Sequence, residues 1–139
     1  MTPFYAQDYD YSKYNVLAVD DIPLNLLLVQ KMLGRFNFTM RTAANGQQAL
    51  DAVAEKKPDL ILLDLMMPGI DGFEVLKRLR ENPETADIRI IILSALNSND
   101  DIVKGYNMGA NDFIMKPIIM EKLLTSIVTQ MQIVEAAHK

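Results

Sequence analysis

The stretch "DLILLDLMMPGIDG", Asp59 to Gly72, joins an apolar run to a charged turn. Its first part, Asp59–Leu63, is solidly apolar after the opening aspartate, which is typical of a parallel strand covered on both faces. Asp64 follows the run directly, and Pro68 and Gly69 then turn the chain. A carboxylate at the end of a buried strand costs desolvation energy unless a neighbouring group compensates its charge. The rest of the sequence should therefore supply such a group.

Strand and helix patterns alternate along the rest of the chain. Four further apolar runs predict strands at Asn15–Val19, Phe38–Ala43, Ile88–Leu93 and Asp112–Met115. Amphipathic segments predict helices from about Pro23 to Gly34, Asn45 to Lys57, Asp71 to Asn82, Asn97 to Ala110 and Ile118 to about Ala137. Five strand–helix units in a row predict an α/β fold, with a doubly wound, five-stranded parallel sheet and helices on both faces. We expect the flavodoxin-like strand order 2-1-3-4-5.

Composition excludes several classes of function. The chain has 139 residues and a net charge of −4, which predicts one domain without a basic face for DNA or anionic lipid. The absence of cysteine excludes thiol catalysis and thiolate metal sites, and it agrees with the cytoplasmic location that we expect. The single histidine, His138, excludes Ser-His-Asp catalysis and multi-histidine metal sites. No apolar run approaches the roughly 20 residues of a membrane span.

The N-terminus has a distinct composition. We expect residues 1–13 to form a poorly ordered leader or linker, and residues 14–139 to form the domain. Four of the five tyrosines fall in the first 14 residues, at Tyr5, Tyr9, Tyr11 and Tyr14. A linker cut from a longer protein and an arm that docks a partner both remain open as interpretations.

Polar side chains follow four of the five predicted strands. Asp20 and Asp21 follow the first, Asp64 the third, Ser94 the fourth and Lys116 the fifth. Ligands of open parallel sheets bind beyond the carboxyl ends of the strands where the strand order reverses, so the aspartates should converge on one cleft. Three carboxylates repel one another unless one is protonated or a cation lies between them. Lys116 offsets one charge, and all-oxygen ligands favour magnesium over zinc for the remainder. Asp64 is the candidate nucleophile, because aspartate can form an acyl phosphate.

These residues resemble the receiver domain of two-component response regulators. The resemblance covers roughly Lys13 to Glu135. It is carried, in the family's order, by Asp20-Asp21, the run Asp64–Gly72, Ser94-Ala95, Gly109–Phe113 and Lys116-Pro117. Each motif alone is weak, but their combination on matching strand ends is specific.

The resemblance implies a phosphoryl-transfer site. Asp64 would accept a phosphoryl group from a phosphohistidine on a histidine kinase or a histidine phosphotransfer domain. Asp21 and Asp64 would hold Mg²⁺ (or Mn²⁺) directly, Asp20 would hold it through water, and the main-chain carbonyl of Met66 would be a further ligand. Such a domain is not a turnover enzyme in the usual sense, although it catalyses its own phosphorylation and dephosphorylation.

The resemblance also implies a conformational switch. Lys116 would pair with the phosphoryl group, and its bond to Pro117 would be cis. Ser94 would move toward the phosphoryl group and Phe113 would turn inward behind it. Because phenylalanine lacks a phenol hydroxyl and gains little by pointing at water, we expect the inward state to be somewhat more populated before phosphorylation than it would be with the tyrosine that is equally familiar at this position. The signal would then pass to an output protein or domain that the sequence does not name, or through a phosphorylation-dependent homodimer, without direct DNA binding.

Other interpretations compete with this one. Asp20-Asp21 could cap the helix that begins near Pro23, and Asp71 is expected to cap a helix rather than to join the site. The alternative function is a phospho-independent interaction module on the same fold, against which the intact acidic pair, acceptor and lysine argue. An aspartyl phosphatase usually carries a second aspartate two residues after the nucleophile, where this chain has Met66. A nucleotide carrier would want a Gly-rich or Ser/Thr-rich loop in place of "DDIPLN".

Overall fold

The computed structural model describes residues 11–96 and 98–137, and strands and helices alternate along them. The strands are β1 (Asn15–Val19), β2 (Thr39–Ala43), β3 (Leu60–Leu63), β4 (Arg89–Ser94) and β5 (Asp112–Met115). The helices are α1 (Pro23–Gly34), α2 (Gly46–Glu55), α3 (Gly72–Glu81), α4 (Asn99–Asn107) and α5 (Met120–Ala137). The strands form one parallel sheet in the order β2-β1-β3-β4-β5, which confirms the predicted fold class and strand order.

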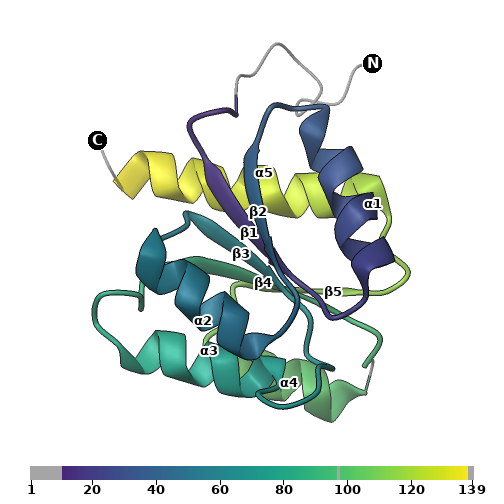
Figure 1. Ribbon diagram of the computed structural model, residues 1–139, viewed down its shortest axis with the longest axis vertical. Helices are drawn as coiled ribbons and strands as arrows, with labels where there is room; N and C mark the ends of the chain where they lie inside the picture. The colour runs from purple at the N-terminus through teal and green to yellow at the C-terminus, as the bar shows by residue number, and fades with distance from the viewer. Residues whose placement is uncertain (1–10, 97, 138–139) are drawn as a thin grey trace.

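Helices cover both faces of the sheet. α1 and α5 lie on one face, and α2, α3 and α4 lie on the other (Figure 1). Successive residues of a strand point to opposite faces. In β3, Leu62 accordingly joins the core beneath α1 and α5, whereas Ile61 and Leu63 join the core beneath α2 and α3. A strand buried on both faces has no polar positions, which explains the unbroken apolar run in the sequence.

Local signals start the helices where the sequence predicts. Pro23 occupies the first turn of α1, and Asn45 caps α2 by accepting the Gln48 N–H. The Asp71 carboxylate caps α3 through the Glu74 N–H at 2.9 Å, which confirms its predicted role. Among the described residues, no helix is long and apolar enough to cross a bilayer.

The N-terminal segment contributes to the core from Tyr11 onward. Residues 1–10 of the expected leader lie outside the described residues, as do Asn97 and His138. The Tyr11 side chain is buried and stacks on Phe38, with ring centroids 4.8 Å apart. Residues 11–13, which the sequence assigns to the leader, also contact β2 and α5: the Ser12 carbonyl accepts the Thr39 hydroxyl, and Lys13 pairs with Glu135. The order of residues 1–10 stays a prediction.

Candidate functional site

An acidic pit lies beyond the carboxyl ends of the two central strands. Val19 of β1 pairs with Leu63 of β3, so the residues that follow them emerge side by side. The Asp64 N–H donates to the Val19 carbonyl at 3.0 Å, which fixes the position of Asp64 along the end of β1. Carboxylate oxygens of Asp20, Asp21 and Asp64 all lie within 4.8 Å of one another. The predicted convergence of the three aspartates is therefore present in the structure.

Lys116 reaches the pit from the end of β5. Its Nζ lies 2.9 Å from Asp20 Oδ2 and 3.7 Å from Asp64 Oδ2. Its backbone N–H donates to the Ser94 carbonyl at 2.8 Å, and its bond to Pro117 is cis, as the resemblance implies. One ammonium group thus faces three carboxylates. The pit keeps an excess of negative charge that a divalent cation would balance.

The environment of Asp64 disfavours its charged form. The side chain is buried, and this burial raises the pKa of Asp64 above its usual value. Lys116 opposes the rise in pKa, whereas the charges of Asp20 and Asp21 add to it. The Met66 N–H donates to Asp64 Oδ1 at 3.3 Å and gives a smaller opposing contribution. Asp64 therefore ionises most readily when a further positive charge enters the pit.

The chemistry of the donor set fits Mg²⁺ or Mn²⁺. All three side chains offer carboxylate oxygens, which are hard ligands suited to these ions. One carboxylate oxygen from each residue lies within 4.8 Å of the others, so the three side chains are close enough to bind one ion together. Met66, whose carbonyl is the fourth predicted ligand, belongs to the loop that follows Asp64.

Asp20 is held by three protein donors. Asp20 Oδ1 accepts the Ile22 N–H at 2.9 Å, and Oδ2 accepts both Lys116 Nζ and the Asn25 side-chain amide at 3.1 Å. α1 itself has Ile22 at its N-cap, without a side-chain cap hydrogen bond, so the interpretation of Asp20 and Asp21 as a helix cap is wrong. Asn25 is not among the site residues predicted from the sequence. Its signal is a short amide side chain in the first turn of a helix that begins just after two acids.

Ser94 and Phe113, the two predicted switch residues, have different surroundings. Ser94 is fully buried at the end of β4, and its Oγ accepts the Leu96 N–H at 3.0 Å. Phe113 of β5 is half-buried, and its ring packs against Gly105 of α4. A Cβ atom at Gly105 would lie 3.2 Å from Phe113 Cδ2. The absence of a side chain at Gly105 thus makes room for this ring beneath α4.

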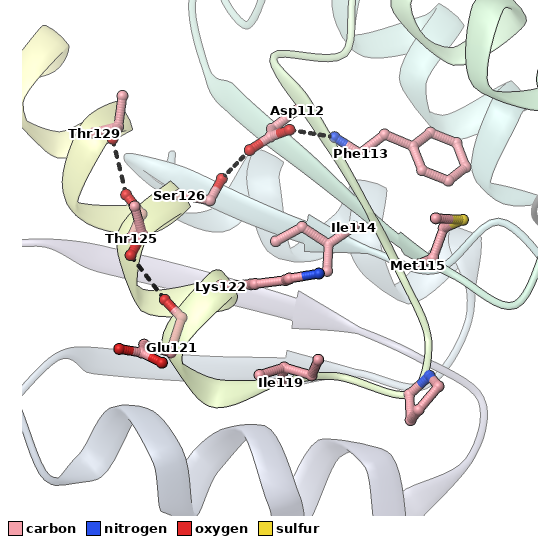
Figure 2. Close-up of a pocket in the computed structure, with 11 residues that line it drawn as sticks. Asp112, Phe113, Ile114, Met115, Ile119, Glu121, Lys122, Thr125, Ser126 and Thr129 are labelled. Carbon is pink, nitrogen blue, oxygen red and sulfur yellow. Dashed lines mark hydrogen bonds between the residues drawn. The ribbon is translucent and has the colours of Figure 1, made fainter.

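The other side of β5 borders an open groove. The groove has a volume of about 620 Å³ and lies between β5 and α5 (Figure 2). Asp112 accepts hydrogen bonds from the Ser126 hydroxyl and from the Phe113 N–H, whereas the Phe113 ring points away from α5. Met115 and Ile119 on this side are each 51% exposed. The surface of α4, β5 and α5 therefore combines a half-buried aromatic ring with exposed apolar groups.

Comparison with known proteins identifies the family. The family model described as the response regulator receiver domain matches residues 16–128, and the chain belongs to this family. Response regulator PleD of Caulobacter vibrioides is 42% identical over 103 residues, which cover 74% of this chain and 23% of PleD. Protein PilH of Pseudomonas aeruginosa is 34% identical over 112 residues, which cover 81% of this chain and 93% of PilH.

Solved structures agree with this assignment. The chemotaxis protein CheY4 of Vibrio cholerae superimposes with a TM-score of 0.78 at 30% identity, covering 84% of this chain and 97% of CheY4. The chain nevertheless spans less than half the length of several curated relatives, for example 46% of the DNA-binding regulator RpaA of Synechocystis. The matched residues therefore correspond only to the receiver domain of such relatives.

Proposed function

We propose that this chain is a phospho-accepting signalling switch. Asp64 receives a phosphoryl group from a phosphohistidine on a histidine kinase or a phosphotransfer domain, and the surface of α4, β5 and α5 changes in response. The observation that carries the proposal is the convergence of Asp20, Asp21 and Asp64 within 4.8 Å, with Lys116 Nζ 3.7 Å from Asp64 Oδ2. This arrangement offers a nucleophile, oxygen ligands for a cation and an ammonium group in one place.

The transfer step uses these groups in distinct ways. An Asp64 oxygen attacks the phosphorus atom, and the new O–P bond forms as the N–P bond breaks. The electron pair of the broken bond stays on the imidazole nitrogen of the donor, which takes a proton. Lys116 turns from Asp20 toward the phosphoryl oxygens and pairs with their charge. Mg²⁺, held directly by Asp21, Asp64 and the Met66 carbonyl and through water by Asp20, would neutralise negative charge on the phosphoryl group.

A protein donor has an apolar surface beside the pit to contact. Ile22 and Leu24, just after the acidic pair, are 49% and 61% exposed. The donor histidine lies on another domain or chain, because the sequence has a single histidine, His138, at its next-to-last position. The output partner is a further protein or domain, or a second copy of the chain. The net charge of −4 gives no reason to expect direct DNA binding.

Phosphorylation by a small donor tests the proposal. Purified protein is incubated with acetyl phosphate and Mg²⁺, and intact mass is measured before and after hydroxylamine, which cleaves acyl phosphates. We expect the mass increase of one phosphoryl group, lost after hydroxylamine and absent in Asp64→Asn. Asp71→Asn is the matched control, because asparagine keeps the cap of α3 while the same charge is removed.

Two results would contradict the proposal. An adduct of equal yield in Asp64→Asn would show that another residue is the acceptor. A wild-type chain that binds Mg²⁺ but takes up no phosphoryl group, from acetyl phosphate or from a kinase, would favour the phospho-independent interaction module instead.

A further inference from the structure

Lys116 can pair with either of two carboxylates in the pit, and in the structure it is hydrogen-bonded to one of them. Its Nζ is 2.9 Å from Asp20 Oδ2 but 3.7 Å from Asp64 Oδ2, so in this state the ammonium group is hydrogen-bonded to Asp20. The proposed function requires Lys116 to contact phosphoryl oxygens on Asp64. Lys116 must then weaken or break its contact with Asp20.

Asp20 cannot easily lose a donor. Its side chain is 9% exposed, so bulk water has little access to replace Lys116. A buried carboxylate that loses a hydrogen bond without replacement is strongly disfavoured. The Ile22 N–H binds the other oxygen, Oδ1, and does not compensate Oδ2. A water bound to Mg²⁺ would offset part of this loss, and a second protein donor on Oδ2 keeps the carboxylate hydrogen-bonded to the chain while Lys116 moves.

Asn25 supplies that donor. Its Nδ2 donates to Asp20 Oδ2 at 3.1 Å, the same oxygen that Lys116 binds. The backbone of Asn25 is fixed by its own N–H, which donates to the Ile22 carbonyl at 3.0 Å. The amide is neutral, so it satisfies Asp20 without adding charge to the pit or competing for the phosphoryl group.

We propose that Asn25 is a positioning residue for phosphoryl transfer, which keeps the Asp20 carboxylate hydrogen-bonded while Lys116 turns to the phosphoryl oxygens. This inference rests on the proposed function of Asp64 as the acceptor. It assigns to α1 a role in the chemistry besides forming the surface beside the pit. It also explains why three protein donors gather on one carboxylate: one of them must be able to leave.

The variant Asn25→Asp tests whether Asn25 acts in phosphoryl transfer or only stabilises α1. The substitution keeps the shape of the side chain but replaces its donor with a fourth carboxylate. An aspartate in the first turn favours a helix, because it complements the helix dipole, so α1 itself should not be weakened. Gln30→Glu is the matched control, because it makes the same amide-to-acid change at an exposed position of the same helix.

Three quantities are measured on each protein: the initial rate of phosphoryl uptake from acetyl phosphate at limiting and at saturating Mg²⁺, the dissociation constant for Mg²⁺ by NMR titration without donor, and the midpoint of thermal unfolding. We expect Asn25→Asp to slow uptake by about tenfold or more, as for the loss of one hydrogen bond to a charged group. Its Mg²⁺ affinity should be unchanged or higher, because a carboxylate has been added. Its unfolding midpoint without metal should fall, because the new carboxylate lies against Asp20, and Mg²⁺ should reverse this loss. Gln30→Glu should match the wild type. Asn25→Gln, which keeps an amide donor, should retain more activity than Asn25→Ala.

The outcomes separate the two claims. Uptake by Asn25→Asp within about twofold of the wild type would overturn the role of Asn25 and leave the role of Asp64 intact. A defect that disappears at saturating Mg²⁺ would also overturn it, since Asn25 would then act on metal affinity alone. A wild-type protein that accepts no phosphoryl group would remove the proposed function, and this inference with it.

Discussion

The central strands β1 and β3 differ from the edge strand β5 in how firmly their residues are enclosed. Every residue of β1 and β3 is buried, whereas in β5 only Ile114 is buried and Met115 is exposed. The proposed metal ligands follow the central strands. Two of the three residues proposed to move, Lys116 and Phe113, belong to the edge strand or follow it, whereas the third, Ser94, ends the buried strand β4. Groups that must keep a fixed spacing thus stand on enclosed backbone, and the two larger mobile side chains stand where fewer neighbours resist a shift.

Two glycines show the same difference at atomic scale. A Cβ atom at Gly72, at the start of α3, would collide with the Asp64 carbonyl and lie 2.6 Å from Leu65 Cα. A Cβ atom at Gly105, on α4, would instead meet the side chains of Ile92 and Phe113 at 2.9 and 3.2 Å. Backbone packs on backbone beside the pit, whereas side chains that can rotate fill the space beneath α4.

The largest expected effect comes from filling the space at Gly72. Gly72→Ala should lower the free energy of unfolding by about 3 kcal/mol or more, because backbone cannot move aside as a side chain can. Chemical denaturation measures the loss. Because the collision involves the Asp64 carbonyl, any folded fraction should also take up phosphoryl groups more slowly.

Gly34→Ala is the control for Gly72→Ala. Gly34 ends α1, and nothing lies within 4 Å of a Cβ atom placed there. Alanine should stabilise this position by up to about 1 kcal/mol, through its higher helix propensity. An equal loss in the free energy of unfolding at Gly34 and Gly72 would show that tight backbone packing beside the pit is not the cause.

The fold could be predicted because its signals are local. The unbroken apolar run of β3 and the alternation of strands with capped helices determine a parallel sheet, and each is visible in a short window of sequence. Helix boundaries depend on capping and on local φ angles. The helix predicted from Asn97 to Ala110 is confined to Asn99–Asn107, because Ser98 caps its start and Gly109 adopts a left-handed φ of 105° soon after its end.

From the sequence, only those site residues that directly follow a strand could be predicted. Asp20, Asp21, Asp64 and Lys116 follow strands directly, so sheet topology alone brings them together. The bond from Asn25 to Asp20 depends on the angle at which α1 leaves the sheet, which local sequence does not specify. Burial of Tyr11 likewise depends on Phe38, a contact between distant parts of the chain.

A smaller loss of stability is expected from filling the space at Gly105, beneath α4. Gly105→Ala should lower the free energy of unfolding by about 1–2 kcal/mol, less than Gly72→Ala, because the Phe113 ring can rotate outward. NMR chemical shifts of the Phe113 ring should report its displacement. Val103→Ala, at a position 55% exposed on the same helix, should change neither quantity appreciably. A loss at Gly105 as large as that at Gly72 would mean that the two regions are equally rigid.

A smaller effect should come from removing charge in the pit. Burial raises the pKa of Asp64, so the folded chain binds a proton more readily than the unfolded chain. The free energy of unfolding therefore falls as pH rises from the usual aspartate pKa through the raised one. At neutral pH without metal, Asp64→Asn should raise the unfolding midpoint by roughly 2–4 °C, or about 1 kcal/mol.

Mg²⁺ should reduce this gain, because it stabilises the wild-type protein by binding the folded state. Asp71→Asn should leave the midpoint nearly unchanged with and without the ion. A midpoint that falls in Asp64→Asn would show that Lys116 already compensates the carboxylate fully, and the pit would not be a region of stored repulsion.

The smallest effect concerns water at the rim of the pit. Met66 is 55% exposed and lines a groove of about 450 Å³ with Pro68 and Leu96, next to Asp64. Apolar groups cannot orient a water molecule for attack on an acyl phosphate, so we expect the phosphorylated chain to persist for longer than seconds. Met66→Asn should shorten its lifetime by about threefold, a change below 1 kcal/mol in the barrier.

Met115→Asn is the matched control for Met66→Asn, because Met115 is 51% exposed but belongs to β5. Decay of the phosphorylated protein, followed by intact mass after removal of the donor, compares the two variants. An equal shortening in both would mean that the lifetime depends on general surface polarity. A shortening confined to Met66 would show that the hydrolysis rate depends on side chains at the rim beside β3 and not on exposed side chains of β5.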